Sequence, residues 1–266
     1  MNNQILMRNP LSELVEYSSM VKSMVRREIR GRYKGSILGF LWNFLTPLAQ
    51  ILVYIIVFSI VFKPNIDNYA IYLTIGMILW IFFSETLCES SHVLVSNSDL
   101  LKKIYFPRMV LPLSTVLSKF VNFLIMLVIY FVIALITGYG IDPLATASLL
   151  LFIPIFVVFL FGLGLLLSSI NVYLRDVEYM TTVTMMFLVW LCPIMYSRAQ
   201  FESGFLDTLL SLNPMTYFVD VFHDILYLKC IPDPLDLVIC LIIACVAFLL
   251  GILVFNYLEK DFAEVI

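Results

Sequence analysis

The stretch that most constrains the fold of this chain runs from residue 37 to residue 62 and contains no charged side chain. A helix needs about 20 apolar residues to cross the ~30 Å hydrocarbon core of a bilayer, so this stretch is long enough to cross one. Six basic residues come shortly before it: Lys22, Arg26, Arg27, Arg30, Arg32 and Lys34. Because basic residues beside a span are retained in the cytoplasm, the sequence predicts a transmembrane helix that is entered from the cytoplasmic side.

The composition extends this prediction to the whole chain. Of its 266 residues, 62% are hydrophobic and 13% are charged, which excludes an ordinary soluble domain. Six apolar stretches are expected to span the membrane, at residues 39–62, 69–87, 120–137, 148–169, 181–196 and 235–258. About 13 of the 16 basic residues then lie on the cytoplasmic side, and Lys63, Arg198 and Lys229 lie outside. We therefore expect an all-α integral membrane protein with one domain, residues 1–266, and with both termini in the cytoplasm.

Residues 1–36 are expected at the cytoplasmic face, where they include an amphipathic helix. Apolar side chains recur there at a spacing close to 3.6 residues, at Leu11, Leu14, Val15, Val21, Val25 and Ile29. The basic residues fall on other faces, so the helix is expected to lie in the membrane interface with its basic side near anionic headgroups. A solvated helix packed on a partner is the alternative. At the other terminus, residues 259–266 form the expected cytoplasmic tail.

A second cytoplasmic segment, residues 96–112, separates the second and third spans. Asn97 and its two serine neighbours can cap a short helix there, and Pro107 cannot continue it. The apolar side of this helix would be formed by Leu100, Leu101, Ile104 and Tyr105. Close to this segment, Glu85 and Glu89 are expected at the aqueous boundary, and Lys119 is expected to extend toward the headgroups.

Residues 197–234 are too apolar for a free loop and too acidic to span. We expect a re-entrant pair of helices within residues 205–227, because backbone that enters lipid must satisfy its own hydrogen bonds. Asn213 and Pro214 would mark the turn between the two helices, and Asp220 and Asp224, four residues apart, would face water or a pore. With Tyr217, these residues would form a gate at the outer mouth of a channel. The alternative is a distorted seventh span at residues 206–228.

The sequence lacks the motifs of an energy-coupling or catalytic site. It contains no GxxxxGK[ST] phosphate loop, no HExxH, no GxSxG and no CxxC. No expected span carries paired charges at its centre, as carriers driven by protons or sodium do. We therefore expect a transport subunit that is not an enzyme and binds no cofactor or metal, and whose driving force comes from another subunit. His223 beside Asp224 is interpreted as a polar spot on an interfacial helix.

Aromatic side chains recur every four residues along the first span, at Tyr54, Phe58 and Phe62. Sugar rings present C–H faces that stack on aromatic rings, so this aromatic face is a candidate lining for a glycan channel. Trp80, Phe82 and Phe83 in the second span are candidates for the same role. Ordinary helix packing or lipid contact is the alternative for all six residues.

Five stretches, in this order along nearly the whole chain, resemble the permease subunits of ABC-2 type polysaccharide exporters. They are RREIRGRYKGSILGFLWNFLTPL (26–48), GMILWIFFSETL (76–87), SNSDLLKKIYFPRMVLPLS (96–114), LRDVEYM (174–180) and LNPMTYFVDVFHDIL (212–226). The resemblance implies two permease copies that form a channel in the bacterial cytoplasmic membrane, and two separate ATPase subunits beneath it that bind ATP and Mg²⁺. The family's coupling helix would correspond to Asp99, Leu100, Leu101, Lys102, Lys103, Ile104 and Tyr105. His223 stands where a basic residue, commonly arginine, is expected.

The sequence thus predicts the channel-forming subunit of an exporter for a lipid-linked polysaccharide of the O-antigen, capsule or teichoic-acid type. Its expected partners are a second copy of itself, the ATPase, the polysaccharide and membrane lipids, with no nucleic acid. A permease of the same architecture for a lipid or a drug is the alternative. A membrane transferase for lipid-linked sugars would need a cluster of metal-binding acids, for which Glu85 and Glu89 are the candidates.

Overall fold

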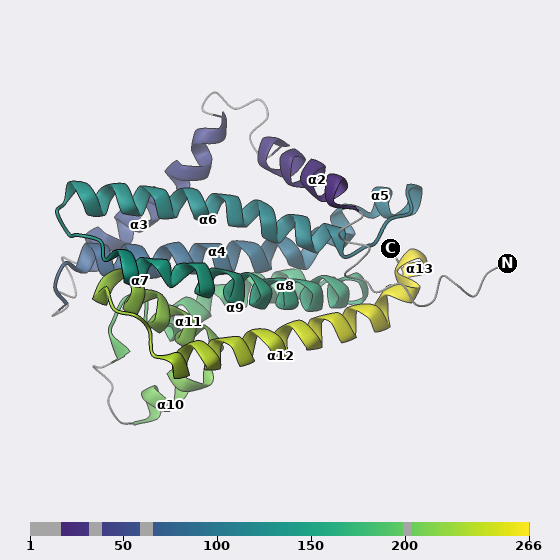
Figure 1. Cartoon of the computed structure of the whole chain (residues 1–266). Coiled ribbons are helices and arrows are strands. Elements are labelled where there is room, and N and C mark those ends of the chain that lie inside the picture. The colour runs from purple at the N-terminus through teal and green to yellow at the C-terminus, as the bar shows by residue number, and fades with distance from the viewer. Residues whose placement is uncertain (1–16, 32–38, 59–65, 199–203, 266) are drawn as a thin grey trace.

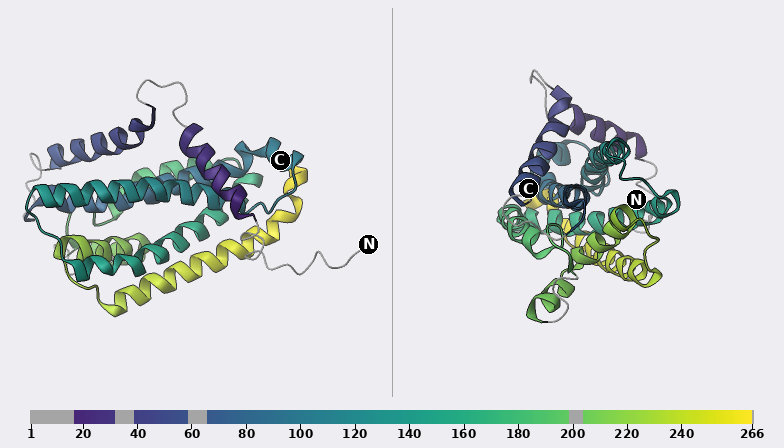
Figure 2. Two further views of the ribbon diagram at one scale, coloured as in Figure 1. Left: turned by 45° about the horizontal axis from the view of Figure 1, so that its top comes forward. Right: turned by 90° about the vertical axis from the view of Figure 1, so that its left-hand side faces the viewer.

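Four of the expected spans are long helices that run side by side (Figures 1 and 2). The computed structural model describes residues 17–31, 39–58, 66–198 and 204–265, and the regular elements within these ranges are all helical. The long helices are α4 (Tyr69–Ser96), α6 (Val110–Ile136), α8 (Leu149–Tyr173) and α12 (Pro234–Leu258). At 1.5 Å per residue, each is longer than the ~30 Å hydrocarbon core. The chain is therefore a multi-pass membrane protein.

The first and fifth expected spans are shorter helices. α3 (Trp42–Val57) follows a 3₁₀ turn, η2 (Gly39–Leu41), and α9 (Val177–Leu188) continues into a second 3₁₀ turn, η4 (Val189–Leu191). The fifth element therefore begins at residue 177, four residues before the predicted start at 181. It ends at residue 191, before the predicted end at 196, and Pro193 follows two residues later. Residues 59–62 of the first expected span, Phe62 included, lie outside the described ranges.

Two predicted helix boundaries are wrong by several residues. α4 continues to Ser96 instead of ending at 87, and α6 begins at Val110 instead of at 120. Hydropathy marks only the part of a helix that lipid surrounds, whereas the helix continues until a cap or a proline ends it. In the extra turns of α4, Ser90 and Ser91 are fully buried against the bundle, so tertiary packing stabilises the extension.

The expected amphipathic helix is α2 (Ser18–Gly31), which packs against α6. Val21 and Met24 are buried, whereas Lys22 and Arg26 are exposed, so the prediction of two contrasting faces is confirmed. Residues 11–16 of the predicted helix lie outside the described ranges.

The two ends of the bundle carry different short elements (Figure 1). At one end, called the α5 end, lie α5 (Ser98–Lys103), η7 (Glu259–Asp261) and α13 (Phe262–Val265). At the other, called the α7 end, lie α7 (Pro143–Ala147) and α11 (Pro214–His223). The C-terminal segment is docked on the bundle at the α5 end, because Phe262 is buried, packs edge-on against Phe255 and lies 5.5 Å below the guanidinium of Arg108.

The predicted turn at Asn213 and Pro214 is present. It joins α10 (Phe205–Leu212) to α11, the Asn213 Oδ1 accepts a hydrogen bond from the Met215 N–H at 3.0 Å, and Pro214 is the first residue of α11. α11 is embedded in the bundle, with Met215, Phe218 and Phe222 fully buried, and a short π-helix, η6 (Asp224–Leu228), follows it.

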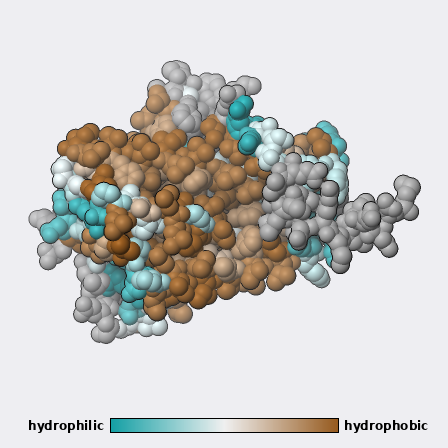
Figure 3. All heavy atoms as spheres, in the orientation of Figure 1, coloured by the Kyte–Doolittle hydropathy of each residue, from teal (hydrophilic) through white to brown (hydrophobic). Residues whose placement is uncertain are grey.

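A broad hydrophobic band covers the middle of the molecule, and hydrophilic residues gather toward its two ends (Figure 3). α6 and α12 contribute large exposed aliphatic side chains to the surface, among them Val128, Val132, Leu135, Leu249, Leu250 and Leu253. A patch of this extent on a soluble monomer would drive association. The band is the lipid-facing surface of the protein.

α8 and α12 meet at backbone distance. A Cβ added to Gly251 would lie 2.1 Å from the carbonyl oxygen of Gly162, and one added to Gly162 would lie 2.5 Å from the Phe248 Cα. Cys240, Ala244, Ala247, Gly251 and Phe255 are the residues of α12 that are buried. Small residues along one stripe thus let two apolar helices pack closely where lipid supplies no hydrophobic driving force.

Replacing Gly251 with alanine is expected to destabilise the fold by about 1–3 kcal/mol, because the new methyl group must push the two backbones apart. Thermal unfolding of the purified protein in detergent measures this loss. The matched control is Gly31→Ala on α2, where no neighbouring heavy atom lies within 4 Å of the added Cβ. Equal melting temperatures for the two variants would contradict the close contact.

Candidate functional site

A groove of about 440 Å³ lies between α3, α4 and α9. Its walls combine aromatic rings with polar side chains, and its lining residues are Gln50, Tyr54, Trp80, Ser84, Glu85, Cys88, Thr182, Met185, Met186, Val189 and Trp190. Binding sites for neutral polar ligands have this composition, in which rings supply contact area and a few polar groups fix orientation. We therefore take this groove as the candidate functional site.

The aromatic face of α3 points toward the groove. Tyr54 lines it directly, Phe58 stacks on Tyr54 with ring centroids 6.1 Å apart, and the Trp190 ring of η4 lies 6.3 Å from that of Phe58. A spacing of four residues places two side chains on one helix face, which is why the sequence could predict this pair. Trp190 was not predicted, because it lies 132 residues along the chain from Phe58 and only the fold brings the two rings together.

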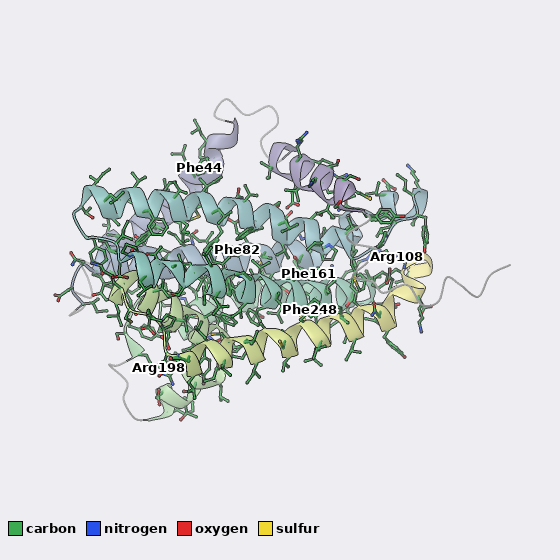
Figure 4. The ribbon with its side chains drawn as sticks, in the orientation of Figure 1. Phe44, Phe82, Arg108, Phe161, Arg198 and Phe248 are labelled. Atoms are coloured by element: carbon green, nitrogen blue, oxygen red, sulfur yellow. The ribbon has the colours of Figure 1, made fainter. Side chains whose placement is uncertain are left out.

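Of the three aromatic residues predicted in α4, only Trp80 lines the groove. Trp80 faces the groove, whereas Phe82 packs in the core between α6 and α8, with ring centroids 4.8 Å from Phe123 and 5.7 Å from Phe156 (Figure 4). Phe83 stacks on Phe159 at 6.1 Å. Successive residues of a helix are rotated by about 100°, so Phe82 lies on nearly the opposite side of α4 from Trp80, whereas Phe83 lies near Trp80 and their ring centroids are 5.5 Å apart.

Glu85 forms an ion pair with Lys119 of α6. The Lys119 Nζ is 2.8 Å from Glu85 Oε2 and 3.7 Å from Glu89 Oε2, and the Lys119 side chain is only 3% exposed. The prediction that Lys119 extends to the headgroups is therefore wrong: desolvating an ammonium is costly, and the two carboxylates offset that cost within the bundle. An ammonium in contact with both carboxylates also disfavours a divalent cation there, which weakens the transferase alternative.

A second hollow of about 190 Å³ lies on the other side of Glu85, between α3, α4 and α6. Trp42 and Thr46 line it from α3, and Lys119 and Asn122 line it from α6. Glu85 borders both hollows, so a single carboxylate contributes to the polar lining of each.

The structure divides the predicted coupling helix into two parts. α5 ends at Lys103, with Asp99 in its first turn and Lys102 and Lys103 in its last, and the chain is extended at Ile104. Leu100 and Leu101 are half-buried against the protein's own bundle, whereas Ile104 and Tyr105 are 54% and 88% exposed. The apolar surface available to a partner is therefore formed by Ile104 and Tyr105.

Arg198 holds the predicted outer-gate helices together (Figure 4). Its guanidinium donates to Asp207 Oδ1 at 3.2 Å and to Ser211 Oγ at 2.7 Å, both on α10, and it lies 3.5 Å from Asp220 Oδ2 on α11. It also lies 5.9 Å from the centre of the Tyr217 ring. Burial raises the pKa of Asp220 to about 6, and Arg198 opposes that rise. This role of Arg198 was not predicted from the sequence. Its four partners are spread over the 22 residues that follow it, and no local sequence pattern links them.

His223 is buried rather than interfacial. Its ring stacks on Tyr72 with centroids 4.0 Å apart, and its Nε2 lies 3.1 Å from the Tyr72 carbonyl oxygen. Burial lowers the pKa of His223 to about 4, so the imidazole is neutral at pH 7. The interpretation of His223 as a polar spot at the interface is therefore wrong. Asp224, the other predicted gate carboxylate, is half-exposed at the end of α11.

Residues 20–227 match the family of ABC-2 type transporters. The chain belongs to this family. It is 28% identical over 208 residues to an O-antigen export system permease protein RfbA of Klebsiella pneumoniae, which covers 77% of this chain and 78% of the relative. It is 32% identical over 208 residues to the O-antigen export system permease protein RfbA of Myxococcus xanthus, covering 76% and 78%.

The ABC-2 match contains every element described for the site. The groove helices α3, α4 and α9, the α5 surface and the α10–α11 pair all lie within residues 20–227, whereas α12 lies beyond it. This chain is thus an ABC-2 transporter membrane subunit in which the matched region carries the candidate site.

Proposed function

We propose that this chain is the channel-forming permease subunit of an ATP-driven exporter for a lipid-linked polysaccharide of the O-antigen, capsule or teichoic-acid type. The observation that carries the proposal is the similarity to O-antigen export permeases over about three quarters of the chain. The groove lined by Tyr54, Trp80 and Trp190 supports it. The chain has no phosphate loop of its own, so ATP and Mg²⁺ would bind a separate ATPase, two copies of which serve a permease homodimer.

In this proposal the chain crosses the bacterial cytoplasmic membrane six times. Helical residues 39–58 would extend about 30 Å, enough for a span, and α9 with η4 would extend about 22 Å, which requires local thinning of the bilayer or cover from α10 and α11. α10 and α11 form the re-entrant pair. Among the described residues, the α7 end carries the acids Asp67, Asp142, Asp207, Asp220, Asp224, Asp233 and Asp236 but only two basic residues, Arg198 and Lys229. By the positive-inside rule, this end faces outward and both termini are cytoplasmic.

Single cysteines test this topology in a background in which the five native cysteines are replaced by serine. Asp233 and Lys260 are both exposed and flank α12 at opposite ends. A cysteine at 233 is expected to react with a membrane-impermeant thiol reagent in intact cells, and one at 260 only after the cells are opened. Labelling of position 260 in intact cells would rule out the six-span arrangement and favour a seventh span at 206–228.

The groove can hold a glycan loosely enough for it to slide. Tyr54 and the exposed Trp190 offer rings for stacking, while Gln50, Ser84 and Glu85 offer hydrogen-bond partners for hydroxyl groups. Contacts of this kind are individually weak and similar for successive sugars, so a chain can advance without a deep energy minimum. A drug or free lipid would gain less from the polar wall, which is why the polysaccharide is favoured over these cargoes.

Alanine at both Tyr54 and Trp190 is expected to slow export of the glycan at least about tenfold, because two stacking platforms are lost. The measurement is ATP-dependent translocation of a lipid-linked polysaccharide by the purified complex in proteoliposomes. Tyr257→Ala, which removes an exposed ring elsewhere on the surface, is the control. Normal glycan export by the double variant would exclude the groove as the path, and a loss of the dimer would assign these rings to packing.

The ATPase would dock on the α5 end through Ile104 and Tyr105. Aspartate at both positions is expected to abolish co-purification of the ATPase while the permease remains in the membrane, because two charges would enter an apolar contact. Leu144→Asp at the α7 end is the matched control, since Leu144 is also exposed. Co-purification that survives the double change would place the docking surface elsewhere.

A further inference from the structure

A separate groove of about 470 Å³ lies between α2 and α6, away from the α3–α4–α9 groove. Its floor is apolar and comes from both helices: Val21, Val25 and Ile29 on α2, and Leu117, Phe120 and Val121 on α6. Lys22 and Arg26 form its remaining edge. The site therefore pairs a deep aliphatic and aromatic floor with two cations on one side.

The groove lies at the depth where the hydrocarbon core begins. Leu117 and Val121 are seven and eleven residues after Val110, or about 10–17 Å from the start of α6. α6 is about 40 Å long, so up to about 10 Å of it extends beyond the ~30 Å core when the helix is close to upright. The first ten residues of α6 include the polar Ser114 and Ser118, whereas its last ten are apolar apart from Tyr130. The part of α6 that extends beyond the core is therefore its first turns, at the α5 end. A headgroup at the edge and an acyl chain on the floor fit this depth.

The two edge cations are available to a ligand. Lys22 and Arg26 are four residues apart on one face of α2, both are exposed, and neither has an ion-pair partner among the residues that the structure describes. Arg27, by contrast, donates to Asn97 Oδ1 at 2.8 Å, which tethers α2 to the junction of α4 and α5. This bond, together with the packing of α2 on α6, holds the two walls of the groove beside each other.

We propose that this groove binds one anionic membrane phospholipid, with an acyl chain on Leu117, Phe120 and Val121 and its phosphate against Lys22 and Arg26. Two adjacent cations favour a headgroup with net negative charge over a zwitterionic one, because the choline or ethanolamine of the latter cancels its phosphate. The lipid would fill the space between α2 and α6 and join them as a bridging ligand.

Native mass spectrometry of the purified permease tests the site with phosphatidylglycerol and phosphatidylcholine of identical acyl chains. The unchanged protein is expected to retain one phosphatidylglycerol at least about tenfold more tightly than phosphatidylcholine. Lys22→Gln with Arg26→Gln should remove this preference, and both positions are exposed, so folding is not at risk. Val121→Trp, which fills the open floor, should lower the retention of both lipids.

The matched control is Lys102→Gln with Lys103→Gln, which removes the same charge from exposed positions on α5 outside the groove. This control is expected to keep the preference for phosphatidylglycerol. Equal retention of the two lipids by the unchanged protein would overturn the proposal, as would an undiminished preference after the Lys22 and Arg26 substitutions. The measurement requires neither the ATPase nor the glycan, so its outcome is independent of the export assay.

Discussion

The contact between α8 and α12 at Gly162 and Gly251 is the interaction on which the bundle depends. Within lipid, apolar side chains gain little by leaving their surroundings, so helices associate only where their backbones approach closely and pack well. α12 is exposed along most of its length and is buried along a single stripe of mainly small residues. Without that stripe, α12 would be as stable surrounded by lipid as it is packed on α8. The pairing also positions Phe255, against which the docked Phe262 closes the α5 end.

Polar interactions connect the helices at two further places in the bundle. Lys119 pairs with Glu85 and also lies close to Glu89 between α4 and α6, and Glu85 in turn borders the groove that contains Tyr54 and Trp80. At the α7 end, Arg198 connects α10 to α11 through Asp207 and Asp220. At both sites one basic side chain contacts two carboxylates. Removing charges from water is costly, and contact with an opposite charge offsets part of that cost, which favours a defined geometry.

The two ends of the molecule thus have different chemistry. The α5 end presents the exposed Ile104 and Tyr105 beside Lys102 and Lys103, and α2 brings further basic residues to the same part of the bundle. The α7 end is acidic, and it holds the embedded helix α11 with its neutral His223.

The local features of the fold could be predicted from the sequence, because they depend on neighbouring residues. Apolar length identified the four long helices, the alternation of apolar and basic residues identified α2, and Asn213 with Pro214 identified the start of α11. The family resemblance also depended on short stretches that remain recognisable without the fold. The spacing of Tyr54 and Phe58 correctly placed both rings on one face of α3.

Only the tertiary structure decided which partners the side chains have across the bundle. The sequence suggested that Lys119 reaches the headgroups and that Trp80, Phe82 and Phe83 act alike, whereas Lys119 is buried in an ion pair and the three rings face different neighbours. It contained no sign that Arg198 would connect two helices or that Trp190 would lie near Phe58. Helical periodicity assigns residues to faces, but the direction of each face is set by how the helices pack. That packing depends on contacts between residues up to 160 positions apart, such as Tyr227 with Asp67.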